Sequence, residues 1–188
     1  MRELEKTWDG TGNGKIRLMF QDEARFGRIT DPSRCWAPYP LRPLCKAMLT
    51  REYTYAYAAV SIADGKLDTL VLPYANTECM QTFLNVIASR YPNERIVMVA
   101  DGAGWHRSKL LDIPKNMKLL KLPAYSPELN PVENLWDDLR EKSFGNRIFS
   151  SLNTLEKYLC SALKDFEAMT ARIKSIVSWD WIISSLVN

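Results

Sequence analysis

Three acidic residues lie at the ends of predicted strands or at the start of a predicted helix, where α/β folds often place catalytic residues. Asp22 follows the apolar run 15–21, Asp101 follows the run 95–100, and Glu133 lies at the start of a predicted helix. Grouped carboxylates suit Mg²⁺ or Mn²⁺, because these hard ions prefer oxygen ligands and keep waters for substrate phosphates. Two such ions can activate a nucleophile on one side of a phosphodiester and stabilise the leaving oxygen on the other. Taken singly, each acid could equally be a cap or a turn residue.

The residues around the three acids form longer motifs. They are FQDEARFG at 20–27, DGAGWHRS at 101–108 and LPAYSPELNPVENLW at 122–136. These motifs closely resemble the three catalytic blocks of the DDE transposases, within the mariner-like superfamily and its bacterial insertion-sequence branch. The third block, L-P-x-Y-S-P-x-L-N-P-x-E-x-x-W, is long and highly specific, and the second has Gly102 where the family usually has Asn. The three blocks follow one another in the family's order.

The resemblance implies an α/β, RNase H-like catalytic domain in which Asp22, Asp101 and Glu133 hold two Mg²⁺ or Mn²⁺ ions. It implies metal-dependent cleavage of DNA at the ends of a mobile element, followed by transfer of the freed 3′-hydroxyl to target DNA. The expected partners are the double-stranded DNA of the element ends and of the target, bound by a homodimer. Only 31 residues separate Asp101 from Glu133, which indicates a connecting segment slightly shorter than is usual in the family.

The pattern of apolar residues predicts the elements that must position these acids. Strands are expected at 15–21, 53–62, 67–72, 95–100 and 117–122, with a hairpin turn at 63–66. Helices are expected at 78–90 after a Thr77 cap, and at 107–111, 130–142, 151–166 and 168–186. The predicted architecture is a mixed five-stranded sheet flanked by helices. RNase H-like folds use this order, although periodicity alone also allows other α/β folds.

The chain is expected to hold one catalytic domain. Residues 1–14 combine charges with three glycines and look like a tail or leader, and residues 15–188 form the domain, with its C-terminal helices from about 151. Transposases of the resembled family carry N-terminal helix-turn-helix domains, which 14 residues cannot hold. We therefore expect the catalytic part alone, as a fragment, a truncated copy or one half of a split reading frame whose other half binds DNA.

Basic residues are concentrated near two of the three acids. Residues 15–51 hold eight basic and three acidic residues, and residues 101–121 hold five and two, although the whole chain carries only +3. Chance clustering on solvated faces explains such numbers as well as DNA binding does. With the motifs in view, we predict that these side chains neutralise DNA phosphates. They are Arg25, Arg28, Arg34, Arg42, Arg107 and Lys109.

Aromatic and polar residues beside the acids have two interpretations each. Trp105 and Tyr125 can stack on a base or sugar, or pack to fix their loops. His106 can touch a phosphate or orient a water, or it can cap the following helix. We predict that all three contact DNA.

Further polar residues are expected around the acids without binding the ions. In a continuous strand Glu23 points away from Asp22, so we predict Glu23 as an electrostatic neighbour only. Asn130 and Asn134 flank Glu133 and can hydrogen-bond it, although a helix cap is the simpler role for Asn130. Trp136 lies at core spacing on the same helix.

The composition excludes several classes of protein. A chain of 188 residues with 46% hydrophobic residues can bury a full core and is not intrinsically disordered. The four cysteines are too widely spaced, and the single histidine too few, for a zinc site. The longest apolar runs are of strand length, with no signal peptide. We expect a soluble protein of the bacterial cytoplasm, associated with the nucleoid.

Two alternatives to a transposase remain open at this point. One is an RNase H-like nuclease such as a resolvase or an RNA–DNA hybrid nuclease, against which the long third block argues. The other is an inactive transposase remnant that serves as a DNA-binding module, against which the presence of all three acids argues.

Overall fold

The computed structural model describes residues 8, 14–29, 36–41, 51–102, 110–123 and 126–187 of the chain. The strands are β1 (Ile16–Gly27), β2 (Tyr53–Ser61), β3 (Leu67–Leu72), β4 (Arg95–Ala100) and β5 (Met117–Lys121). The helices are α2 (Thr77–Arg90), α3 (Val132–Leu139), α4 (Leu152–Glu167), α5 (Thr170–Val177) and α6 (Asp180–Val187). A 3₁₀ turn, η2 (Pro127–Leu129), precedes α3, and a π-helical turn, η3 (Arg140–Phe144), follows it.

The five strands form one mixed sheet in the order β3-β2-β1-β4-β5. The β1–β2 and β2–β3 pairs are antiparallel, whereas the β1–β4 and β4–β5 pairs are parallel. The parallel pairing of β1 with β4 covers only the first part of β1, up to Phe20 opposite Val99. The predicted five-stranded mixed sheet is therefore confirmed, with β1 at its centre.

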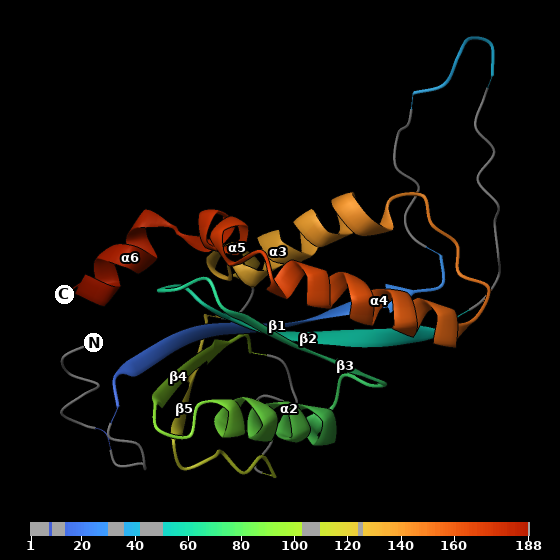
Figure 1. Cartoon of the computed structure of the whole chain (residues 1–188). Helices are drawn as coiled ribbons and strands as arrows, with labels where there is room; N and C mark the ends of the chain where they lie inside the picture. Colours follow the sequence, from blue (N-terminus) through green and yellow to red (C-terminus); the bar gives the residue numbers. More distant parts are fainter. Residues whose placement is uncertain are drawn as a thin grey trace.

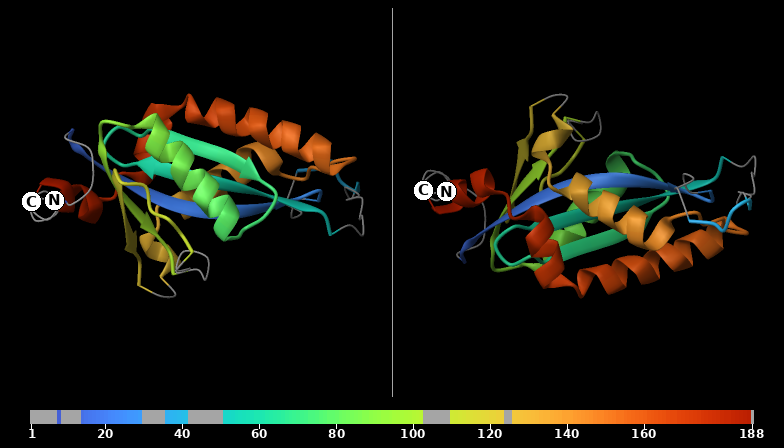
Figure 2. Two further views of the ribbon diagram at one scale, coloured as in Figure 1. Left: turned by 90° about the horizontal axis from the view of Figure 1, so that it is seen from below. Right: turned by 90° about the horizontal axis from the view of Figure 1, so that it is seen from above.

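Helices cover both faces of this sheet (Figure 1). Helix α2 lies on one face, and α3, α4 and α5 lie on the other, as the two further views also show (Figure 2). Because side chains alternate along a strand, the neighbours Met19 and Phe20 belong to different hydrophobic clusters. Met19 packs with Phe83 of α2, whereas Phe20 shares the larger cluster with Trp136 of α3. Burial on both faces holds β1 rigidly between the two helical layers.

The predicted end of the first strand at residue 21 is wrong. β1 continues to Gly27, and its second half pairs with β2 from Gln21 opposite Ala59 to Gly27 opposite Tyr53. The buried side chains of Ala24 and Phe26 lie on the face covered by α3 and α4. Charged residues interrupt the apolar pattern here, and the pairing that extends the strand comes from a distant segment. Asp22 consequently lies inside a continuous strand.

Three helix predictions also need correction. The cap of α2 is Asn76, whose side chain accepts a hydrogen bond from the Cys79 amide at 2.9 Å, and not Thr77. The single helix expected at 168–186 is two helices, because the backbone leaves the helical conformation at Ser178, next to Trp179, whose indole donates to the Ile176 carbonyl at 3.1 Å. The helix expected at 130–142 begins two residues later, as α3, and its last part is the π-helical turn η3. Most of the one expected at 107–111 lies outside the described residues.

No helix in the described part of the chain combines the length and the apolar character needed to cross a membrane.

Candidate active site

Asp22 and Asp101 lie just beyond the end of the β1–β4 pair. The last paired residues are Phe20 and Val99, and each acid is two residues further along the chain. The charge of Asp101 contributes to raising the pKa of Asp22. Neighbouring strands lie roughly 4.8 Å apart, and residues two apart share a face. Asp22 therefore falls on the face that carries Phe20, which is the face covered by α3.

Glu133 reaches this place from the first turn of α3. Two side chains of the same segment hold it against β1. Asn130 donates from Nδ2 to the Gln21 carbonyl at 3.0 Å, and Trp136 donates from Nε1 to Oδ2 of Asp22 at 2.9 Å. Glu133 stands between these two contacts in the sequence, so the residues that dock α3 also bring its carboxylate to Asp22.

Burial and neighbouring acidic charges raise the pKa of Asp22 and of Glu133. Asp22 is only 7% exposed, and burial raises the pKa of its carboxyl to about 8, with further increases from Glu133, Glu23 and Asp101 and an opposing effect of the Trp136 N–H. Burial also raises the pKa of Glu133. The charge of Arg140 opposes this increase, and the charge of Asp101 adds to it. Clustered, desolvated carboxylates are unfavourable unless a proton or a cation compensates their charge. The acids therefore favour binding of a proton or a cation.

Glu23 lies on the other face of the sheet from Asp22. It is opposite Tyr57 in the β1–β2 ladder, and its charge contributes to raising the pKa of the Tyr57 hydroxyl on the α2 side. Glu23 also raises the pKa of Asp22. Its location matches an electrostatic neighbour of Asp22 better than a shared ligand.

The flanking asparagines differ in their surroundings. Asn130 is buried, and its Oδ1 accepts a hydrogen bond from the Val132 amide at 3.3 Å while its Nδ2 bonds the Gln21 carbonyl. It acts as a cap-like residue and ties α3 to β1, and these bonds do not involve Glu133. Asn134 is exposed on α3.

The donor set fits a hard divalent ion. Asp22, Asp101 and Glu133 offer carboxylate oxygens, the ligands that Mg²⁺ and Mn²⁺ prefer. Within the described ranges, no three acidic, histidine or cysteine side chains are grouped closely enough to hold an ion as they stand.

The predicted DNA-binding residues are only partly described. Arg25 is exposed at the end of β1, with its guanidinium carbon 4.5 Å from the centre of the Tyr53 ring. Arg28 donates to the carbonyls of Phe149 and Ser150 and to Glu52, so its guanidinium is committed within the protein. This placement favours a structural role for Arg28. The remaining ones lie outside the described residues: Arg34, Arg42, Trp105, His106, Arg107, Lys109 and Tyr125.

Arg140 is a cation near the acids that sequence reasoning missed. It lies seven residues, or about two helical turns, after Glu133, and its charge opposes the rise in the pKa of that carboxyl that burial causes. Its guanidinium lies 5.5 Å from the Phe26 ring centre and 3.9 Å from Asp137, with the side chain 44% exposed. The seven-residue spacing could have indicated that Arg140 and Glu133 lie on the same side of the predicted helix. A partly exposed guanidinium beside an acidic site can bind a phosphate that the acids alone would repel.

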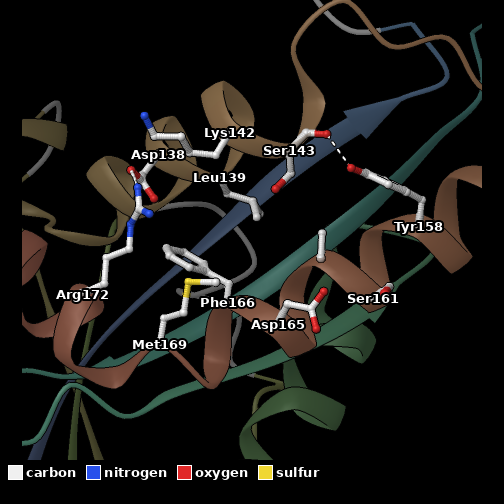
Figure 3. A pocket seen from close by; sticks show the side chains of 11 residues that line it. Asp138, Leu139, Lys142, Ser143, Tyr158, Ser161, Asp165, Phe166, Met169 and Arg172 are labelled. Atoms are coloured by element: carbon white, nitrogen blue, oxygen red, sulfur yellow. Dashed lines mark hydrogen bonds and ion pairs between the residues drawn. The ribbon is translucent and has the colours of Figure 1, made fainter.

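A surface pocket lies where α3 and η3 pack against α4 and α5 (Figure 3). Asp138 of α3 accepts a hydrogen bond from Arg172 of α5 at 2.7 Å, and the Tyr158 hydroxyl of α4 donates to the Ser143 carbonyl of η3 at 2.8 Å. The lining does not include Asp22, Asp101 or Glu133. These contacts therefore stabilise the helix that presents Glu133 from the side away from the acids.

The comparisons with known proteins agree with this geometry. Residues 17–156 match the family model described as "DDE superfamily endonuclease". The chain belongs to this family. The relationship predicted from the three sequence motifs is thus confirmed.

The similar proteins of this DDE-family chain include one from Sinorhizobium fredii. It is named "Uncharacterized protein y4pE/y4sA" and is 38% identical over 130 residues, which cover 69% of the chain and 96% of the relative. Among solved structures, the Mos1 strand transfer complex is similar with a TM-score of 0.56 at 15% identity, over 87% of this chain and 55% of that one. The mariner Mos1 paired end complex with Mg has a TM-score of 0.59 at 16% identity, over 86% and 52%.

These structural similarities establish the fold of the DDE-family chain. The mixed five-stranded sheet flanked by helices is of the RNase H-like type, as predicted. The chain spans just over half the length of the Mos1 chains that it matches.

Proposed function

We propose that residues 15–188 are a transposase catalytic domain that cuts and joins double-stranded DNA with divalent metal ions. The observation that supports this most is the buried carboxyl of Asp22, whose pKa is raised by burial and by the charges of Glu133 and Asp101. A Mos1 structure of the same fold is a paired end complex with Mg. We further propose that the chain acts as a homodimer on two DNA ends, in the nucleoid of a bacterial cell.

In this function Asp22, Asp101 and Glu133 hold the ions, which supply positive charge for the phosphate and for the attacking and leaving oxygens. Asp22 is the fixed member because β1 is paired with β2 throughout the second half of the strand. Glu133 is half-buried on a helix end and can adjust its side chain. Arg140 and Arg25 bind backbone phosphates and draw DNA to a site whose own acids repel it.

The proposed chemistry has two steps. First, a water oxygen bonds to phosphorus and the 3′-oxygen leaves with a proton, giving a 3′-hydroxyl and a 5′-phosphate. Next, that 3′-hydroxyl attacks a target phosphodiester, so a new strand junction forms and the target's own 3′-oxygen leaves with a proton. The acids serve both steps in the same positions, since each is an in-line displacement at phosphorus.

The proposal is tested by the variant Asp101→Asn. We expect it to lose Mn²⁺-dependent nicking of supercoiled plasmid, because it removes one anionic ligand, while the circular dichroism spectrum and non-specific DNA affinity stay as in the wild type. Asp112→Asn is the matched control, since Asp112 is an exposed acid in the following segment. Nicking at the wild-type rate by Asp101→Asn would overturn the proposal.

A second prediction concerns Arg140. Arg140→Gln is expected to weaken binding of a DNA duplex of any sequence, and to reduce the slope of log affinity against log salt concentration by about 1, because one phosphate contact is lost. Fluorescence anisotropy of a labelled duplex at several salt concentrations measures both quantities. Lys157→Gln, which removes an exposed cation of α4, serves as the control. Equal salt slopes in Arg140→Gln and the wild type would exclude the contact.

A further inference from the structure

Trp136 makes an unusual contact for a core residue. Its side chain is 2% exposed and belongs to the hydrophobic cluster between the sheet and α3, with its ring edge-on to Phe26 at 6.2 Å between ring centres. Packing alone would require only a large apolar ring. The indole N–H, however, donates to Oδ2 of Asp22 at 2.9 Å, a carboxylate 114 residues away in the sequence.

The surroundings of Asp22 give this bond a specific effect. The carboxylate is 7% exposed, so few solvent molecules can compete for its oxygens. When Asp22 is ionised, as it would be beside a cation, its hydrogen bond with the indole is stronger than one between neutral groups, and burial strengthens it further. The bond therefore fixes the rotation of the carboxylate about its last side-chain torsion.

The backbone beside Asp22 is fixed from the same helix. Asn130 donates to the Gln21 carbonyl at 3.0 Å, immediately before Asp22. β1 itself is paired with β2 at Asp22 opposite Ala58. One segment of the chain, 130–136, thus holds both the main chain and one carboxylate oxygen at this position.

We propose that Trp136 is a positioning residue for Asp22: its N–H holds Oδ2, so that a divalent cation binds Asp22 through Oδ1. This role rests on the proposed function, because it assumes that Asp22 is a ligand. It extends that function by assigning the two oxygens of Asp22 different tasks. It also couples Glu133 to Asp22, since both the indole and the Glu133 carboxylate are carried by α3.

The first test uses the wild-type protein and nuclear magnetic resonance. The indole N–H resonance of Trp136, identified by its absence in Trp136→Phe, should shift as Mg²⁺ is added, because the acceptor oxygen belongs to a ligand. The indole resonance of Trp179, which donates to the Ile176 carbonyl at 3.1 Å, should stay unchanged. A Trp136 resonance that does not respond to Mg²⁺ would overturn the role, whether or not the variant folds.

The second test measures Mn²⁺ affinity by calorimetry. Trp136→Phe keeps an aromatic ring and removes the N–H, and we expect its affinity for Mn²⁺ to fall roughly 10-fold or more, as for other groups that orient a metal ligand. Trp179→Phe removes an indole N–H elsewhere and should bind Mn²⁺ like the wild type. Unchanged affinity in Trp136→Phe would overturn the positioning role alone. A wild-type protein that binds no Mn²⁺ would overturn the proposed function as well.

Discussion

Replacing Asp22 by Asn is expected to abolish DNA nicking and, at the same time, to stabilise the metal-free protein. Nicking should fall by on the order of a thousandfold or more, as when one member of a cooperating catalytic set is removed. The free energy of unfolding at pH 7 should rise by about 1 kcal/mol or more, because burial, Glu133, Glu23 and Asp101 raise the pKa of Asp22 to about 8, so that folding must protonate this carboxyl, whereas an amide needs no proton. The new amide can still accept the Trp136 N–H through its oxygen, and its NH₂ group can donate to the neighbouring acids.

Plasmid nicking with Mn²⁺ and chemical unfolding in the presence of a chelator measure the two effects. Asp165→Asn is the control, since Asp165 is an exposed acid of α4 and its replacement should change neither quantity. A loss of nicking accompanied by a loss of stability would contradict the expected result, because it would mean that the Asp22 charge helps to hold the fold. Opposite signs for activity and stability would identify Asp22 as a residue kept for chemistry.

Replacing Asn130 by Ala is expected to cause the largest loss of stability among single polar substitutions near the site. The change leaves the Gln21 carbonyl and the Val132 amide without their side-chain partner in a buried place. Leaving buried groups unpaired costs about 2–3 kcal/mol, which lowers the melting temperature by roughly 5–10 °C for a chain of this size. Nicking should fall too, because the start of α3 is no longer tied to β1 beside Asp22.

Differential scanning calorimetry measures the change in melting temperature. Asn134→Ala is a close control, since it deletes the same amide four residues later, on the exposed side of α3. Similar melting temperatures for the Asn130 and Asn134 variants would show that the bond to Gln21 does not hold α3 in place.

Local patterns were sufficient to predict most of the sheet. The β2–β3 hairpin and the buried strand β4 have clear alternation or continuous apolar runs, and both were predicted almost to the residue. The second half of β1 was missed because its strand character depends on pairing with β2. Asp22, for example, is opposite Ala58, which lies more than thirty residues later in the sequence. The break between α5 and α6 is a change of backbone conformation at Ser178, which no periodic pattern of apolar residues contains.

The candidate site was predictable as residues but not as contacts. The motifs single out Asp22, Asp101 and Glu133, and the charges of Glu133 and Asp101 both raise the pKa of Asp22, while the role of the three acids as metal ligands stays a prediction. The same spacing that marks Trp136 as buried cannot show that its N–H has a carboxylate acceptor, because that acceptor lies on another element. Arg28 illustrates the opposite case: its position in a basic stretch predicts DNA binding, whereas its guanidinium bonds the carbonyls of a distant loop.

The distance along the chain between β1 and α3 also determines when the site can exist. Asp22 receives its hydrogen bond from a residue 114 positions later, and the backbone beside it receives one from 109 positions later. A protein is synthesised from its N-terminus, and long-range contacts form only after both partners have emerged. A nascent chain that has not yet reached the end of α3 therefore carries Asp22 and Asp101 without an assembled acid site. The order of the chain delays assembly of the acid site until translation has passed α3, which ends at Leu139 of 188 residues.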